Sequence, residues 1–293
     1  MNTKHIMKEY DYLKPSGLDE ALQILSEKEK VKIYAGGTDL IVKLKMETVP
    51  DMDYMMDING IEELKQVEYT DEGVRIGANR KLWDIETDQR MTSLFPALTD
   101  AVKAMAAISV RNLASIGGNF CNASPVADAV GPVMCYGGTL EIASARGVRK
   151  VPAKDFFLAP GVTVLEKDEM LTGIFIPTPK GDVGHAFTKM ARTKSDIAKL
   201  SLCVALARDG GRIGHIAMSM GAVAARPLFL EEISAGLAGK EMSESLAMET
   251  GEAVSGFLQP IDDNRTTAVY RKDVTKTMVA DALALAWARS GGA

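Results

Sequence analysis

The chain has 293 residues, of which 46% are hydrophobic and 25% charged, so its length predicts two or three globular lobes with cores of ordinary size. A net charge of −5 argues against nucleic acid as the partner, since phosphate backbones are bound by basic surfaces. No apolar run approaches the ~18 residues that cross a bilayer. The segment from Met1 to Tyr10 lacks the apolar core of a secretory signal, so we expect a cytoplasmic protein.

Residues 1–58 predict a first lobe built from two small α/β units. The spacing of Leu18, Ala21, Leu22 and Leu25 predicts a short helix, with Ser16 as its N-cap. The elements expected after it are a strand over 31–35, a helix over 38–45 that Thr38 and Asp39 cap, and a strand over 54–58.

Residues 59–177 predict a second lobe, joined to the first near Asn59 and to the rest of the chain near Pro177-Thr178-Pro179. The expected elements are a strand over 74–77, a helix over 94–108, a polar loop over 115–128, a helix over 129–136, a hairpin of 139–144 with 148–151, and a strand over 170–176.

Residues 178–293 predict a C-terminal domain in which strands precede helices, which favours an α+β arrangement. Strands are expected over 185–191, 200–207 and 213–220, the last two joined by a tight turn at Asp209-Gly210-Gly211. Helices are expected over 228–237, 243–258 and 275–289.

Cysteine and histidine residues are few and dispersed. They are Cys121, Cys135, Cys203, His5, His185 and His215. Their spacing fits neither a disulfide framework nor a zinc or iron–sulfur quartet, and no HxxxH or HExxH pair occurs. We therefore expect no metal site in this chain. A GxGxxG fingerprint and a Gly-x-Ser-x-Gly elbow are also missing, so neither a Rossmann site nor a serine hydrolase is supported.

A first glycine pair, Gly36-Gly37, lies where a strand, a turn and a helix start meet. Such a junction directs several backbone N–H groups toward one point, which suits a phosphate group. Thr38 adds a hydroxyl donor. Because strand–glycine–helix turns also occur for purely structural reasons, this motif alone leaves both interpretations open.

A second pair, Gly117-Gly118, opens a loop that is rich in short polar side chains. The glycines let the backbone approach a ligand closely, and Asp128 can accept hydrogen bonds from ribityl or ribose hydroxyls. The alternative is a structural turn rich in Asn and Ser. The apolar residues around it make a purely structural polar loop costly to bury, which favours the ligand-binding interpretation.

A third feature is Lys189, near the end of an apolar strand and followed by Arg192. A cation beside a flavin pyrimidine ring would stabilise the anionic reduced form of the flavin. The alternative is a solvated basic edge strand that discourages aggregation.

Taken in order, these motifs resemble those of the FAD-binding subunits of the molybdenum hydroxylase family, which includes xanthine dehydrogenase, molybdenum-type carbon monoxide dehydrogenase and nicotinate dehydrogenase. The likeness covers essentially the whole chain. It rests on the segments 35–40, 114–128 and 187–199. It implies the two-lobed FAD-binding fold of the vanillyl-alcohol oxidase type, followed by an α+β C-terminal domain with a small antiparallel sheet and helices.

The resemblance also implies a cofactor and partners. FAD would bind non-covalently to this chain, while partner subunits would carry two [2Fe–2S] clusters and molybdopterin, and NAD or another acceptor would exchange electrons with the flavin. The expected cofactor-binding residues are Ile33, Tyr34, Ala35, Gly36, Gly37, Thr38, Asp39, Leu40, Ser115, Ile116, Gly117, Gly118, Asn119, Asn122, Ser124, Asp128, Leu171 and Lys189.

A second hypothesis is a self-sufficient flavin oxidoreductase of the same fold, similar to the enolpyruvyl reductases. Such an enzyme needs a proton donor over the flavin, and no serine or cysteine of this sequence is marked for that role. The substrate of a molybdenum hydroxylase is recognised by another chain, so this sequence does not identify it.

Overall fold

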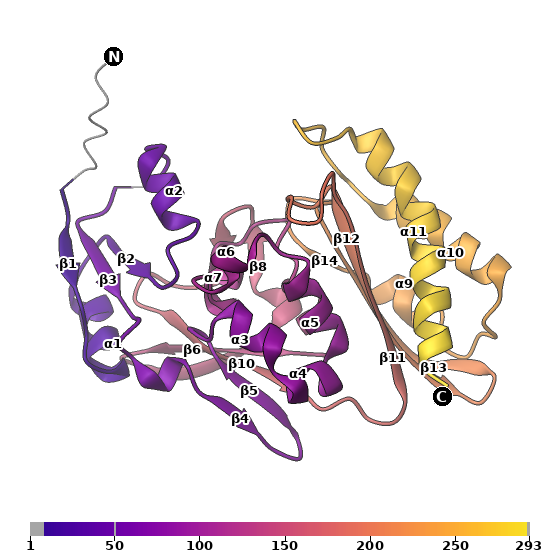
Figure 1. The fold of residues 1–293 in the computed structure, drawn as a ribbon, viewed down its shortest axis with the longest axis horizontal. Coiled ribbons are helices and arrows are strands. Elements are labelled where there is room, and N and C mark those ends of the chain that lie inside the picture. Colours follow the sequence, from indigo (N-terminus) through magenta and orange to yellow (C-terminus); the bar gives the residue numbers. More distant parts are fainter. Residues whose placement is uncertain (1–8, 50, 292–293) are drawn as a thin grey trace.

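The computed structural model describes residues 9–49 and 51–291, so most of the N-terminal segment that we judged not to be a secretory signal lies outside the described residues. Three main sheets follow one another along the described chain, each with its own helices (Figure 1). This is the expected α+β organisation. Across the described part of the chain, no helix combines the length and apolarity needed to span a membrane.

The first lobe is a parallel sheet in the order β1-β3-β2. Helix α1 buries Ala21, Leu22 and Leu25, as their spacing predicted. The predicted Ser16 cap is wrong, because Gly17 occupies the N-cap position and the Ser16 hydroxyl instead donates to Glu20 Oε2 at 2.7 Å. The elements are β1 (Asp11–Leu13), α1 (Leu18–Glu27), β2 (Val31–Tyr34), α2 (Leu40–Lys45) and β3 (Tyr54–Asp57).

The second lobe is an antiparallel sheet in the order β4-β5-β10-β6-β7, with a group of short helices packed on it (Figure 1). Its strands are β4 (Val67–Tyr69), β5 (Gly73–Gly77), β6 (Thr139–Ser144), β7 (Gly147–Pro152) and β10 (Met170–Pro177), and β8 (Phe157–Ala159) pairs separately with β9 (Val162–Thr163). Its helices are α3 (Leu82–Thr87), α4 (Gln89–Leu94), α5 (Pro96–Lys103), α6 (Ile108–Arg111), α7 (Ile116–Cys121) and α8 (Val130–Cys135), with 3-10 turns at Glu62–Leu64 and Ala153–Asp155.

Two predictions for this lobe are wrong. The helix expected over 94–108 is divided, because Pro96 starts α5 and a turn at Ala106, whose φ is +42°, separates α5 from α6. The loop expected over 115–128 begins as helix α7, because the Ser115 hydroxyl accepts a hydrogen bond from Gly118 N and caps it.

The C-terminal domain is a four-stranded antiparallel sheet in the order β11-β12-β13-β14. Strand β12 is buried on both faces: Cys203 and Ala205 pack into the core of the second lobe, while Leu202 and Val204 lie beneath α11, in an apolar cluster that α10 completes. The elements are β11 (Val183–Met190), β12 (Leu200–Asp209), β13 (Arg212–Gly221), β14 (Leu228–Phe229), α9 (Glu231–Ala235), α10 (Glu244–Phe257) and α11 (Ala268–Arg289).

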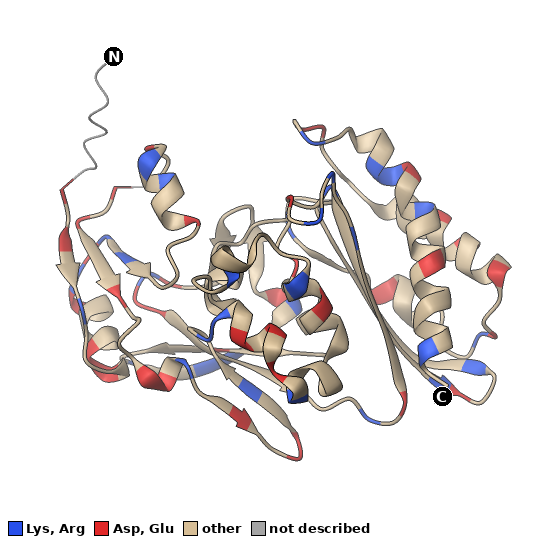
Figure 2. Cartoon of the chain, viewed as in Figure 1, with Lys and Arg blue, Asp and Glu red and all other residues tan. Residues whose placement is uncertain are grey.

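Two helix boundaries in this domain differ from those predicted. The segment 228–237 starts as strand β14, and α11 begins at Ala268 rather than at residue 275, because the Thr267 hydroxyl accepts from Tyr270 N and caps the helix there. Charged residues of both signs are interspersed along all three main sheets and their helices (Figure 2).

Helix α10 crosses α11 at Gly251, and this contact yields a stability prediction. A Cβ at Gly251 would overlap the backbone carbonyl of Lys276, whereas a Cβ at Gly256, on the same helix, would meet nothing within 4 Å. We expect Gly251→Ala to lower the free energy of unfolding by about 1–3 kcal/mol. Gly256→Ala should raise it by about 0.5–1 kcal/mol, because alanine favours helix. Thermal unfolding of both variants checks this, and equal effects would contradict the assigned crossing.

Candidate functional site

The two glycine loops that the sequence singled out lie against each other, although Gly36 and Gly117 are 81 positions apart in the sequence. A Cβ at Gly36 would overlap the carbonyl oxygen of Leu113, directly before the second loop, and would lie 2.8 Å from Ala114 Cα. Only a glycine at this position allows such an approach. The first and second lobes therefore meet where both motifs are located.

The first loop leaves backbone donors available. Gly37 has a φ of +67°, and the turn that it makes leads directly into α2. Among the loop and turn hydrogen bonds of the described chain, none is donated by the N–H groups of Gly36, Gly37 or Thr38. Asp39 occupies the predicted N-cap position of α2, but its side chain makes no capping hydrogen bond and instead pairs with Lys43 at 2.7 Å. These free N–H groups are suited to a phosphate.

The second loop contributes space rather than backbone donors. Gly117 N donates to Ala78 O at 2.7 Å, and Gly118 N donates to the Ser115 hydroxyl at 3.1 Å. Gly118 itself is exposed, and a Cβ there would meet only Ser115 Oγ, at 3.0 Å. A ligand can therefore approach the backbone at Gly118 without displacing protein atoms.

Asp128 and Lys189 form a buried ion pair, which the sequence did not predict. Lys189 Nζ lies 2.7 Å from Asp128 Oδ2, and the two side chains are 6% and 5% exposed. Lys189 also donates to Ala104 O at 2.9 Å. Burial raises the pKa of Asp128 despite the neighbouring lysine. The solvated-edge interpretation of Lys189 is wrong, and Arg192 is the solvated residue, at 81% exposure.

Buried polar atoms without partners test whether this site fits FAD. The described residues contain five such atoms, and two of them, Asn119 Oδ1 and Asp128 Oδ1, belong to the second loop. Asn119 Nδ2 lies 3.6 Å from Met105 Sδ, beside the Ala104 carbonyl that holds Lys189, so these groups converge on one turn. Unpaired buried acceptors are costly. They fit the hydroxyl and N–H donors of a flavin and its ribityl chain.

The remaining predicted residues lie in these loops or beside them. Leu171 is buried at the start of β10, and its neighbour Met170 packs in the same apolar cluster as Ile33 and Ala35. Ser124 makes a turn by accepting from Val126 N at 3.4 Å. Five others lie on β2, α2 and α7 or directly beside these elements: Tyr34, Thr38, Leu40, Ile116 and Asn122.

Sequence reasoning missed several polar residues that hold the loops. Lys43 Nζ donates to Asn122 Oδ1 at 2.6 Å and so links α2 to the second loop. Arg111 Nη1 donates to the carbonyls of Met105 and Ala106 at 2.7 and 2.9 Å and fixes the turn beside Lys189. Asn59 Nδ2 donates to Ala35 O at 2.7 Å. A signal was present in the sequence, since Asn59 directly follows an apolar strand.

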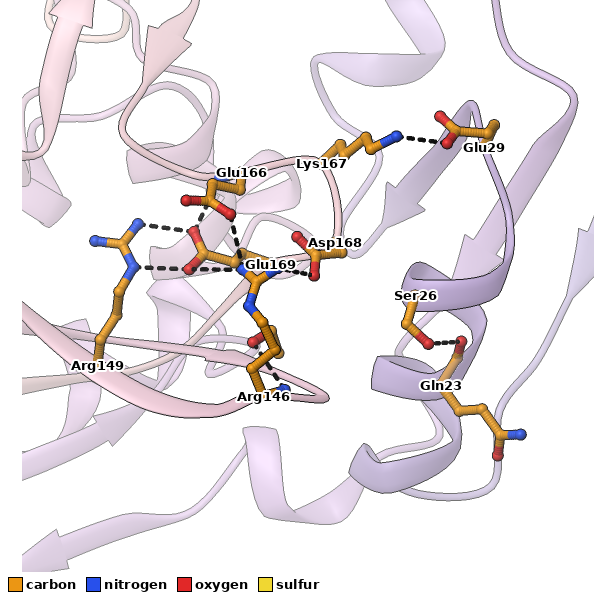
Figure 3. Close-up of polar contacts among 10 residues, drawn as sticks. Gln23, Ser26, Glu29, Arg146, Arg149, Glu166, Lys167, Asp168 and Glu169 are labelled. Atoms are coloured by element: carbon orange, nitrogen blue, oxygen red, sulfur yellow. Dashed lines mark hydrogen bonds and ion pairs between the residues drawn. The ribbon is translucent and has the colours of Figure 1, made fainter.

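A cluster of charged side chains fixes the segment that precedes strand β10, the strand that carries Leu171. The cluster consists of Arg146, Arg149, Glu166, Asp168 and Glu169 (Figure 3). Arg149 donates to both carboxylate oxygens of Glu169 at 2.7 Å and to Val164 O at 2.8 Å. The Glu169 side chain is 4% exposed, and its hydrogen bonds from Arg149 lower its pKa. Arg146, at the hairpin turn, pairs with Glu166 and Asp168 but is 59% exposed.

This cluster predicts a pH-dependent loss of stability. Arg149→Met should lower the free energy of unfolding by about 1–3 kcal/mol at pH 7, because it leaves the Glu169 carboxylate buried without its main donor. Because the pKa of Glu169 is lower in the folded chain than in the unfolded chain, this carboxylate stabilises the fold at a pH above its unfolded pKa of ~4.3. That stabilisation is lost as pH falls through the folded pKa. The gap in free energy of unfolding between Arg149→Met and the parent should therefore shrink in acid. Arg146→Met, the control, should cost ~1 kcal/mol or less. Equal losses at pH 7 and pH 3 would contradict the role of Glu169.

Comparison with known proteins identifies the family to which this arrangement belongs. Residues 8–179 match the family described as the FAD binding domain in molybdopterin dehydrogenase. Residues 185–286 match the C-terminal domain of the carbon monoxide dehydrogenase flavoprotein. Together these matches include all three sheets and every predicted site residue.

Individual relatives agree with this. The glyceraldehyde dehydrogenase medium chain of Sulfolobus acidocaldarius is 32% identical over 270 residues, which cover 92% of this chain and 95% of the relative. The xanthine dehydrogenase FAD-binding subunit of Escherichia coli is 29% identical, over 96% of this chain and 97% of that subunit.

A solved structure of carbon monoxide dehydrogenase from Hydrogenophaga pseudoflava superposes with a TM-score of 0.94 at 29% identity, covering 98% of this chain and 100% of the matched chain. The similarity therefore extends over the first, second and C-terminal sheets rather than over one domain. With the two family matches, it shows that this chain belongs to the FAD-binding subunits of the molybdopterin dehydrogenases, which are oxidoreductases.

Proposed function

We propose that this chain passes electrons between the [2Fe–2S] clusters of a partner subunit and an external acceptor, in a complex whose large subunit holds molybdopterin. The observation that carries the proposal is the convergence of the two glycine loops with the buried Asp128–Lys189 pair. One end of this site offers free backbone N–H groups, and the other offers buried polar atoms without partners.

Within this proposal each part of the site has a separate task. Gly36, Gly37 and Thr38 would donate backbone N–H groups to the diphosphate, and Gly118 would give the space for it. Asn119 and Asp128 would accept hydrogen bonds from the ribityl chain and flavin. FAD supplies the redox chemistry when bound, and Lys189 would bias it by favouring an anionic reduced ring.

The physiological acceptor, NAD or another, is a further part of the proposal, as is a cytoplasmic location. The described residues contain three free cysteines, one exposed and two buried, which supports a reducing compartment. The alternative of a self-sufficient, enolpyruvyl reductase-like oxidoreductase has no comparable support, because the relatives reported above are named as chains or subunits of larger dehydrogenases.

Co-expression of the tagged chain with candidate iron–sulfur and molybdopterin subunits tests this function. We expect a complex that contains flavin, iron and molybdenum. Addition of the substrate of that complex should reduce the flavin and so bleach its visible absorption band. The alternative would be supported instead if the chain purifies with flavin but binds neither partner. It would then have to transfer electrons by itself from a reduced nicotinamide to a substrate of its own.

A further inference from the structure

Lys81 occupies an unusual position behind the two glycine loops. Its backbone forms an isolated bridge with Ser115, and its neighbours Arg80 and Leu82 exchange hydrogen bonds of 3.0 and 2.9 Å with Ile116 and Ala114. The main chain at Lys81 therefore supports the second loop directly.

The side chain of Lys81 reaches toward the first loop. Its Nζ donates to Asn59 Oδ1 at 3.0 Å, and Asn59 Nδ2 donates in turn to Ala35 O at 2.7 Å, so one amide side chain separates the ammonium from the Gly36-Gly37 turn. Asn79 Oδ1 lies 3.4 Å from the same Nζ, and Asn79 is 1% exposed. Lys81 thus links the backbones of both loops.

The charge of Lys81 has no anionic partner in contact. Within the described ranges, no carboxylate oxygen lies within 4.0 Å of its Nζ, whose partners are both amide oxygens. The side chain is half-buried, and burial lowers its pKa. The charge of Lys65 acts in the same direction, while the carboxylates of Asp57 and Asp84, which are not in contact, oppose it. A half-buried cation without a counter-ion is unfavourable unless an anion is supplied.

We propose that Lys81 is the cation that balances the diphosphate of bound FAD, through its position behind the meeting point of the Gly36-Gly37 and Gly117-Gly118 loops. The inference rests on the proposed placement of FAD between these loops. Attraction between two partly buried charges is screened by salt much less than attraction between exposed charges. The ammonium does not need to touch a phosphate oxygen for this effect.

The test measures two quantities on Lys81→Met and on the control Lys65→Met. Lys65 is a nearby lysine that already pairs with Glu62 at 2.7 Å. For Lys81→Met, we expect FAD affinity to fall roughly ten-fold. The melting temperature of the flavin-free chain should change little, because removal of the unbalanced charge offsets the loss of the hydrogen bonds to Asn59 and Asn79. Lys65→Met should leave FAD affinity unchanged, and Lys81→Arg should retain most of it.

A loss of FAD affinity without a fall in the melting temperature separates an electrostatic role from a structural one. Unchanged FAD affinity in Lys81→Met would overturn the proposal. So would a fall in affinity accompanied by a lower melting temperature of the flavin-free chain, because the lysine would then only be holding the loops. Failure of the parent chain to bind FAD would instead remove the placement on which the inference rests.

Discussion

Gly118→Val is expected to purify as a folded chain that has lost its flavin. The position is exposed, and a Cβ there would meet only the Ser115 hydroxyl, at 3.0 Å, so the protein can accept the side chain. A ligand that approaches this backbone would meet the valine methyl groups instead. The visible absorption band of flavin should be absent, while the melting temperature of the flavin-free form stays close to that of the parent.

The neighbouring glycines provide the contrast. A Cβ at Gly117 would lie 2.5 Å from Ala78 O, and one at Gly36 would overlap Leu113 O. Valine at either position should therefore destabilise the chain itself. Gly211→Val, in the turn between β12 and β13 with nothing within 4 Å of a Cβ, should keep its flavin. A Gly118→Val protein with a full flavin content would show that the diphosphate lies elsewhere.

Periodicity predicted the elements that bury a single apolar face. Leu18, Ala21, Leu22 and Leu25 gave α1, and the turn at Gly210, whose φ is +57°, joins β12 to β13 as expected. The errors arose where a local cap or turn overrides periodicity. Ser115 starts a helix inside an apparent loop, and the turn at Ala106 interrupts an apparent helix.

The candidate site was predicted as separate segments, and what the sequence could not give was their pairing in space. The motifs themselves selected Gly36, Gly118, Asp128 and Lys189. Nothing local in sequence shows that Asp128 pairs with Lys189, 61 residues away, because tertiary packing alone brings β11 against the second loop. Lys81 was missed for the same reason, since the amide that links it to the first loop, Asn59, lies 22 residues away.

The buried Asp128–Lys189 pair predicts strongly coupled variants. Lys189→Met should lower the free energy of unfolding by about 3–5 kcal/mol, because it leaves the buried Asp128 carboxylate unpaired. Oδ2 would lose its lysine partner, and Oδ1 has no partner in the structure. Asp128→Asn should also destabilise the chain, whereas the double variant Asp128→Asn/Lys189→Met should be less destabilised than the sum of the two.

Lower pH should partly restore the free energy of unfolding of Lys189→Met, but not that of the double variant. Burial already raises the Asp128 pKa above its ordinary value of ~3.9, and loss of the lysine raises it further. A carboxyl group whose pKa is raised in the folded state favours folding when it is protonated. The loss of folding free energy therefore grows as pH rises above the pKa of the unfolded chain, and it shrinks as pH falls toward that pKa. Chemical denaturation of each variant at pH 4.5 and pH 7, chosen to span about the range in which Asp128 titrates, measures how its free energy of unfolding changes with pH.

The same pair should move the flavin midpoint potential in opposite directions. Lys189→Met removes a positive charge and should lower the potential, Asp128→Asn removes a negative one and should raise it, and the double variant should stay near the parent. Redox titration of the flavin-loaded variants checks this order. Arg192→Met, which alters a side chain that is 81% exposed, serves as the control and should leave the potential unchanged. Equal potentials in all four variants would mean that the pair stabilises the fold without acting on the flavin.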